Sequence, residues 1–157
     1  MTTEVRAEGR ETETFADLVG FASSQVKKSY DSKYGGFGRA PKFPMVDALE
    51  LAQLAYLYQG DKEWENIFTH TLRYMFEGGI YDRAEGGFFR YSTTRDWSIP
   101  HYEKMLEDNA QLLYVLLTAH KLTSDELFAR VSRDVLRYLE NNLYIPEMGG
   151  WAGSQDA

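Results

Sequence analysis

The sequence contains no cysteine, and acidic side chains outnumber basic ones. Its 157 residues include 17 Lys and Arg against 24 Asp and Glu, which gives a net charge of -7. A chain without cysteine forms no disulfide and no Cys-ligated zinc site, and it carries no thiol chemistry. A negative chain is also a poor partner for a nucleic-acid backbone or an anionic membrane surface. We therefore expect neither nucleic acid nor membrane as a partner.

Long apolar runs are missing as well. No stretch of 18 apolar residues and no basic-apolar-small pattern at the start of the chain occur, so the sequence predicts neither a membrane span nor a cleavable signal. From this we expect a cytoplasmic protein. Only three histidines occur, His70, His101 and His120, and no HExxH motif is found. We therefore expect no metal site and no cofactor.

Aromatic side chains, in contrast, are abundant, with 11 Tyr, 9 Phe and 3 Trp. Rigid rings with polar edges suit both a core and a ligand-binding surface. The length is that of one domain with a single core. Residues 1–13 are polar and without periodicity, so we expect a flexible tail or linker there and an ordered helical domain over 14–157.

Helical periodicity alternates between two kinds of segment. Residues 14–29, the segment after Gly60 and the segment after Thr123 each carry one apolar stripe, which predicts helices with one solvated face; Ser124 is the expected N-cap of the last. Residues 45–59 and 101–120 are apolar on most sides, which predicts helices surrounded by protein. The pattern therefore predicts an all-α array with an outer and an inner layer.

Three loops with a Gly-Gly-aromatic motif separate these helices. The motifs read YGGFG, EGGFF and MGGWA, and Gly35, Gly86 and Gly149 are separated by 51 and 63 residues. Such a period indicates repeated helical hairpins, stacked or closed into a ring. Because each loop leads from an outer into an inner helix, all three should meet at one end of the array, which we call the mouth. Inner-helix N-termini would point into it, and their free N-H groups favour oxygen-rich ligands.

Polar groups in the predicted inner helix 101–120 are the candidates for chemistry. His101, Asp108 and Asn109 lie in or beside its apolar face, where a polar group needs a partner or a purpose. Asp108 and Asn109 can tie nearby Gly-rich loops to the helix, or they can serve a ligand or acid-base role; His101 has the same two readings. Together with Glu103, His101 and Asp108 form the candidate catalytic set, in which carboxylates would supply acid-base chemistry of the glycosidase kind.

Aromatic and charged residues of the loops are the candidates for ligand binding. The rings can stack on sugars or can fill the core beneath tight turns, and the cations can present their charge inward or to solvent. The third loop adds an amide and a carboxylate. The full candidate set is Phe37, Lys42, Arg90, Tyr91, Trp97, Asn109, Trp151, Gln155 and Asp156.

The motifs GGFGRAPKFP, GGIYDRAEGGFFRYS, WSIPHYEKMLEDNAQL and GGWAGSQDA, in this order, resemble the helical domain of the spermatogenesis-associated, thioredoxin-domain-containing proteins. The resemblance covers residues 14 to 157. It implies an (α/α)6 toroid similar to six-hairpin glycosidases and N-acylglucosamine 2-epimerases, in a family without an assigned activity. Family members usually have His where Phe89 stands and Asp where Thr94 stands, so two potential acid-base groups are missing here.

The chain supplies about five of the twelve helices of such a toroid. A partial toroid exposes inner helices built for burial, and exposed apolar surface drives association. We therefore expect self-association, or docking with the thioredoxin-like domain and the remaining hairpins. Three functions stay open. The chain can bind a sugar-like or peptide ligand at the mouth on behalf of an attached thioredoxin-like domain, it can be a carbohydrate-active hydrolase or epimerase, or it can be a structural fragment without activity of its own.

Overall fold

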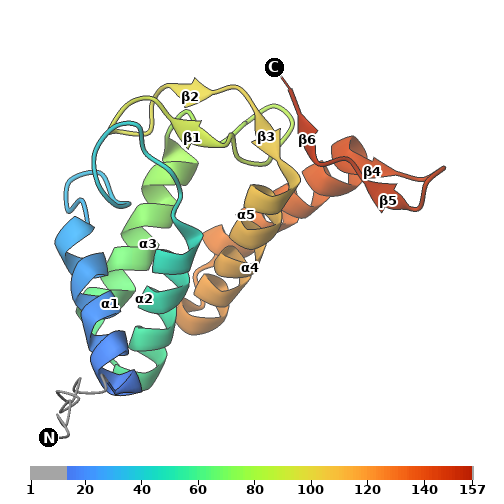
Figure 1. Cartoon of the computed structure of the whole chain (residues 1–157). Coiled ribbons are helices and arrows are strands. Elements are labelled where there is room, and N and C mark those ends of the chain that lie inside the picture. Colours follow the sequence, from blue (N-terminus) through green and yellow to red (C-terminus); the bar gives the residue numbers. More distant parts are fainter. Residues whose placement is uncertain (1–13, 157) are drawn as a thin grey trace, which may run out of the picture.

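The protein is an array of helices in two layers. The computed structural model describes residues 14–156, so the expected tail over 1–13 lies outside the described residues. The outer layer consists of α1 (Phe15–Ser29), α3 (Lys62–Glu77) and α5 (Glu126–Tyr138), and the inner layer of α2 (Val46–Gln59) and α4 (Leu106–Thr123) (Figure 1). A short π-helix, η1 (Leu139–Leu143), extends α5. The alternation of outer and inner helices predicted from the sequence is confirmed.

Polar N-caps define where the three outer helices begin. The side chain of Thr14 accepts a hydrogen bond from the backbone N-H of Asp17, and Asp61 and Asp125 act similarly at α3 and α5. Each cap satisfies one of the free N-H groups of a first turn. The expectation of Ser124 as the N-cap of α5 is wrong: Ser124 ends α4 in a left-handed conformation with φ of 58°, and the cap is the next residue.

The inner helix α4 begins five residues later than expected. Two short strands, β2 (Pro100–His101) and β3 (Lys104–Met105), occupy the start of the expected helix 101–120. β2 pairs with β1 (Tyr91–Ser92), and β3 pairs with β6 (Ser154–Gln155), which lies near the end of the chain. These long-range backbone pairings outweigh the local helical pattern. His101 and Glu103 therefore belong to the mouth loop.

The core lies between the two helical layers and beneath the loops. Large side chains from the outer helices, among them Trp64, Phe68, Phe128 and Tyr138, are buried against α2 and α4. The stripe of α1 is an exception, because Leu18 and Val19 are 51% and 39% exposed. Described neighbours cover only part of this terminal helix, so its stripe is not fully buried.

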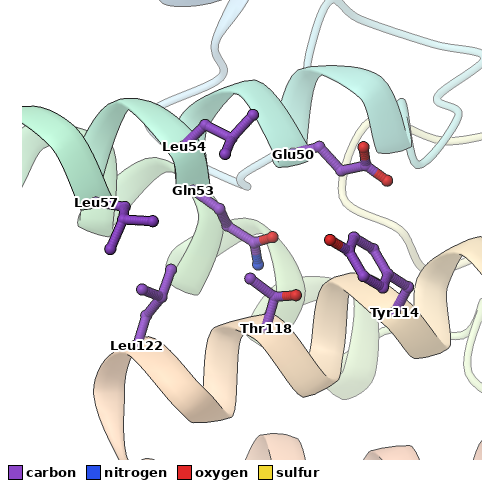
Figure 2. Close-up of a pocket in the computed structure, with 7 residues that line it drawn as sticks. All are labelled: Glu50, Gln53, Leu54, Leu57, Tyr114, Thr118 and Leu122. Carbon is purple, nitrogen blue, oxygen red and sulfur yellow. The ribbon is translucent and has the colours of Figure 1, made fainter.

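A groove runs between the two inner helices. It is lined by Glu50, Gln53, Leu54, Leu57, Tyr114, Thr118 and Leu122 and has a volume of about 70 Å³. Figure 2 shows Glu50 and Tyr114 at one end and Leu57 and Leu122 at the other. The buried Gln53 amide donates a 2.7 Å hydrogen bond from Nε2 to the carbonyl of Val115 and so joins α2 to α4. Leu54, Leu57 and Leu122 make much of the groove lining apolar.

The loops meet at one end of the array, as the sequence predicts (Figure 1). Backbone hydrogen bonds between Lys42 and Ser92 join the first loop (residues 30–45) to the second (residues 78–105). The β3–β6 pair joins the second loop to the third (residues 144–156). The third loop also contains a hairpin of β4 (Tyr144–Ile145) and β5 (Gly150–Trp151), which projects from the helices.

Candidate functional site at the mouth

A buried ion pair, which we call the first latch, closes the first loop. Lys42 is 0% exposed, and its Nζ donates hydrogen bonds of 2.8 Å to Oδ2 of Asp31 and 2.6 Å to the carbonyl of Gly35. Arg95, from the second loop, donates to both carboxylate oxygens of Asp31 at 2.7 and 2.9 Å. Burial raises the pKa of Asp31, but the hydrogen bonds from Arg95 and Lys42 lower it by a larger amount. The pKa of Asp31 therefore lies well below its ordinary value. The carboxylate is therefore charged at neutral pH.

A second latch with the same pattern closes the second loop. Lys104 is 2% exposed, and its Nζ donates to Oδ2 of Asp82 at 2.6 Å and to the carbonyl of Gly86 at 3.1 Å. In both latches the lysine follows the glycine pair and the aspartate precedes it. No arginine joins the second pair among the described residues; instead, Glu85 lies 3.5 Å from the same Nζ. The first latch is thus net positive and the second net negative.

An aromatic ring covers the second glycine of each latched loop. Gly36 and Gly87 have φ of 73° and 77°, and a Cβ at either position would collide with the ring of Trp97 or Tyr138. The lysine ammonium groups lie over these rings, 5.1 Å from the centroid for Lys42 and 4.3 Å for Lys104. Glycine is therefore required here for both conformation and space. The two loops are structural copies of each other.

Residues of the first two loops form a stack of three rings. Phe43 stacks on Tyr91 at 4.7 Å between centroids, and Tyr91 stacks on His101 at 4.8 Å with an interplanar angle of 14°. Both outer members are open to solvent, because Phe43 is 42% exposed and the His101 side chain 48%. Such rings offer a flat apolar surface with a polar edge.

Charged groups flank the imidazole of the stack. Nδ1 of His101 lies 4.0 Å from Oε2 of Glu103, and Arg90 donates a 3.0 Å hydrogen bond to the same oxygen. Pairing with arginine leaves Glu103 able to accept from a further donor through its other oxygen. A proton acceptor and a carboxylate are thus brought together at one exposed position.

Two clefts open beside this group, and both include Tyr102 and Asp156. The larger, of about 450 Å³, is also lined by Thr93, Pro100, His101 and Glu103. The smaller, of about 310 Å³, is also lined by Asp82, Glu85, Phe89, Lys104 and Gln155. Together they form a polar and aromatic surface at the mouth, of a size suited to a small ligand.

Asp108 lies in the first turn of α4 with one oxygen unpaired. Its Oδ2 is buried and makes no hydrogen bond within the described residues. Burial raises the pKa of Asp108 above its ordinary value, against the lowering influence of Arg90. A buried carboxyl of this kind can hold a proton more readily than an exposed one.

Four candidate ligand-binding residues lie in the core. Lys42 belongs to the first latch, the buried Trp97 ring covers Gly36, and Phe37 is 7% exposed. Asn109 is 0% exposed; its amide accepts from the N-H of Phe88 at 2.7 Å and donates to the carbonyl of Phe88 at 2.9 Å. These side chains offer little or no free surface to a ligand, and the hydrogen bonds of Asn109 tie the second loop to α4.

The remaining candidates lie in three places. Tyr91, Arg90, His101, Glu103 and Asp156 surround the larger cleft or its flank. The amide of Gln155 accepts from Tyr138 and lines the smaller cleft. Trp151 lies apart on β5 and is 45% exposed.

Several residues of the mouth were not among the sequence candidates, and Phe43, Tyr102 and Glu85 are three of them. Phe43 completes the stack, Tyr102 lines both clefts, and Glu85 lines the smaller cleft. The signal for Glu85 was its place in the Gly-Gly motif, and Tyr102 stands between two candidates. Phe43 carried no separate signal, since its contact with Tyr91 crosses from one loop to another.

Solved structures with the same arrangement are carbohydrate enzymes. Cellobiose 2-epimerase from Bacillus thermoamylovorans superposes with a TM-score of 0.75 over 90% of this chain and 41% of its own, at 14% identity. A sugar epimerase from a ruminal bacterium gives 0.72 over 88% and 40%, at 15% identity. An α-mannanase from Bacteroides thetaiotaomicron gives 0.69 over 88% and 40%, at 13% identity. The described residues therefore form part of an (α/α)6 toroid.

Sequence comparison shows the family to which the chain belongs. Spermatogenesis-associated protein 20 is 41% identical in Rattus norvegicus and 39% identical in Homo sapiens, in each case over 137 residues. The chain belongs to the spermatogenesis-associated protein 20 family. The match covers 85% of this chain and 17% of each relative, so the chain spans about one sixth of the relatives' length. No protein-family model matches it.

Two further findings concern membrane spans and metal sites. Within residues 14–156, no helix is long and apolar enough to cross a bilayer. The same part of the chain contains no group of three or more His, Asp or Glu side chains placed to hold a metal ion.

Proposed function

We propose that the mouth binds a sugar-like ligand, which lies against the ring stack and is oriented by polar groups of the larger cleft. The observation that carries this proposal is the exposed Phe43–Tyr91–His101 stack next to Glu103. A sugar ring presents C-H groups on its face and hydroxyl groups around its edge. The stack complements the face, and the imidazole and carboxylates complement the edge.

The fold supports the same ligand class. The epimerases and the mannanase that share it are named for sugar substrates. Neither inner helix has a side-chain N-cap, and acidic groups occupy their first turns, as with Asp47 and Asp108. Carboxylates at these positions can accept hydrogen bonds from the hydroxyl groups of a neutral sugar, whereas they would repel an anion.

Thermal unfolding with a panel of neutral sugars, such as glucose, mannose, N-acetylglucosamine and cellobiose, tests the proposal. Ligand at one hundred times its dissociation constant stabilises the folded chain by about 2.7 kcal/mol. Tyr91→Ala and His101→Gln should remove this response. Tyr58→Ala is the matched control, because Tyr58 is an exposed ring at the opposite end of α2. No saturable response to any sugar, or an unchanged response in Tyr91→Ala, would contradict the proposal.

An epimerase activity is a second candidate, favoured by the 4.0 Å approach of His101 to Glu103. Removal of a proton next to a sugar carbonyl requires a general base within reach of that proton. Incubation of reducing sugars with the protein in D₂O should then introduce deuterium next to the carbonyl, detected by NMR. His101→Gln should abolish the exchange. Sugar binding without exchange would leave a binding domain only.

A further inference from the structure

The third Gly-Gly loop repeats the geometry of the first two as far as its first glycine. The second glycine differs, because Gly36 and Gly87 have a positive φ and Gly150 does not. Its tyrosine and aromatic residue are paired as Tyr144↔Trp151, just as Tyr30↔Phe37 and Tyr81↔Phe88 are paired. The tyrosine precedes the first glycine by five residues in every case. The first glycine is left-handed in all three loops, with φ of 65°, 83° and 60° at Gly35, Gly86 and Gly149.

In the first two loops the glycine pair supports the next outer helix. A Cβ on Gly35 would lie 2.6 Å from Cα of Thr71 in α3, and one on Gly86 would lie 2.8 Å from the carbonyl oxygen of Asp134 in α5. Rings cover the second glycines, as described above. The backbone of each glycine pair thus packs directly against an α-helix and an aromatic side chain, and we call this contact surface the seat.

In the third loop no described residue covers the glycine pair. Gly149 and Gly150 have no described atom within 4 Å of an added Cβ. The aromatic residue that follows the pair shows the same difference, since Phe37 and Phe88 are 7% and 0% exposed whereas Trp151 is 45% exposed. Around this seat lie two further exposed apolar residues, Tyr144 at 41% and Met148 at 78%.

We propose that the third loop is a docking surface for the outer helix of a further helical hairpin. By analogy with the first two loops, that helix places its backbone against Gly149 and the hairpin places an aromatic ring against Gly150. Ile145 occupies the position that corresponds to Asp31 and Asp82 in the latches. Because isoleucine carries no charge, the third loop needs no buried lysine as a counter-charge.

The occupant that fits is a hairpin from the rest of a longer family member. The relatives extend over about six times the length that this chain matches, and the solved toroids continue well beyond the 41% that it overlays. The proposal concerns the outer side of the third loop and is independent of ligand binding at the mouth.

A chimera tests the proposal. In full-length rat spermatogenesis-associated protein 20, the matched segment is replaced by the corresponding residues of this chain, and Gly150→Val is introduced into the chimera and into this chain alone. Gly150 does not have a positive φ, so valine introduces no backbone strain. We expect the unfolding temperature to fall by about 4 °C or more in the chimera and by less than about 1 °C in the isolated chain.

Gly153→Val is the control, because Gly153 is open and corresponds to Arg39 and Arg90, which lie in solvent in the other loops. It should be tolerated in both proteins. Hydrogen exchange gives a second measurement: the amide of Ala152, which donates to Leu143, should exchange about tenfold more slowly in the chimera.

Equal tolerance of Gly150→Val in the two proteins, or equal exchange at Ala152, would overturn the proposal. If the isolated chain forms a dimer that Gly150→Val dissociates in sedimentation, the occupant is a second copy, and the proposed hairpin is likewise rejected.

Discussion

Asp31 is the residue on which most of the mouth depends. Its carboxylate, 1% exposed, holds Lys42 and Arg95 and thereby two loops. Asp31→Asn leaves a buried ammonium group without its counter-charge, so we expect a loss of about 3–5 kcal/mol of unfolding free energy at pH 7. Urea unfolding measures it. Glu140→Gln, an exposed change on η1, should stay within about 0.5 kcal/mol.

The pH dependence gives an independent test at the same residue. Because the folded-state pKa of Asp31 is lowered, its contribution is present above the unfolded pKa near 3.9 and is lost as the pH falls below it. The difference between wild type and Asp31→Asn should therefore shrink by about 1 kcal/mol between pH 5 and pH 3. A constant difference would mean that the carboxylate is not held in its charged form.

The environment of single side chains was the feature that could not be predicted from the sequence. Lys42 and Arg90 are both cations in aromatic loops, and nothing local distinguishes them. Only the position of Asp31, eleven residues earlier, makes one a buried latch, while the other pairs with Glu103 at the surface. His101 was expected in an inner helix and lies in the mouth loop instead, where its stack depends on rings from two loops that sequence spacing does not bring together.

At the scale of elements, the glycine turns fix how loops fit onto helices. Gly36→Ala and Gly87→Ala each force an L-residue to a left-handed φ and push a Cβ into an aromatic ring. We expect a loss of about 2–4 kcal/mol for each. Gly20→Ala, in the middle of α1 with no atom within 4 Å, should instead stabilise the chain by about 0.5–1 kcal/mol. Thermal unfolding of the three variants checks both signs.

Elements with strong periodicity could be predicted from the sequence, and short paired strands could not. The five helices follow from stripes, caps and glycines within each segment. The stretch from His101 to Met105 has a helical pattern but is extended, because it pairs with Tyr91 on one side and Gln155 on the other. Those partners lie 10 and 51 residues away, beyond any local signal.

For the whole molecule, the inner layer presents apolar surface that soluble monomers seldom expose. Leu54, Leu57 and Tyr58 on α2, and Tyr114 and Leu117 on α4, are each at least 50% exposed. We expect concentration-dependent self-association, measured by sedimentation velocity. Leu57→Lys with Leu117→Lys should weaken it at least about tenfold, whereas Leu18→Lys on the outer helix α1 should not. A wild-type chain that stays monomeric at high concentration would contradict this expectation.

The latches also affect the kinetics with which a ligand would bind at the mouth. Hydrogen bonds from Lys42 and Arg95 join the first two loops, and the β3–β6 pair joins the second to the third, so the mouth is braced from loop to loop. Because these hydrogen bonds already hold the loops in place, ligand binding orders few additional groups and little conformational entropy is lost. We therefore expect ligand association in a single kinetic phase, without the slow step of a closing lid; stopped-flow fluorescence measures it.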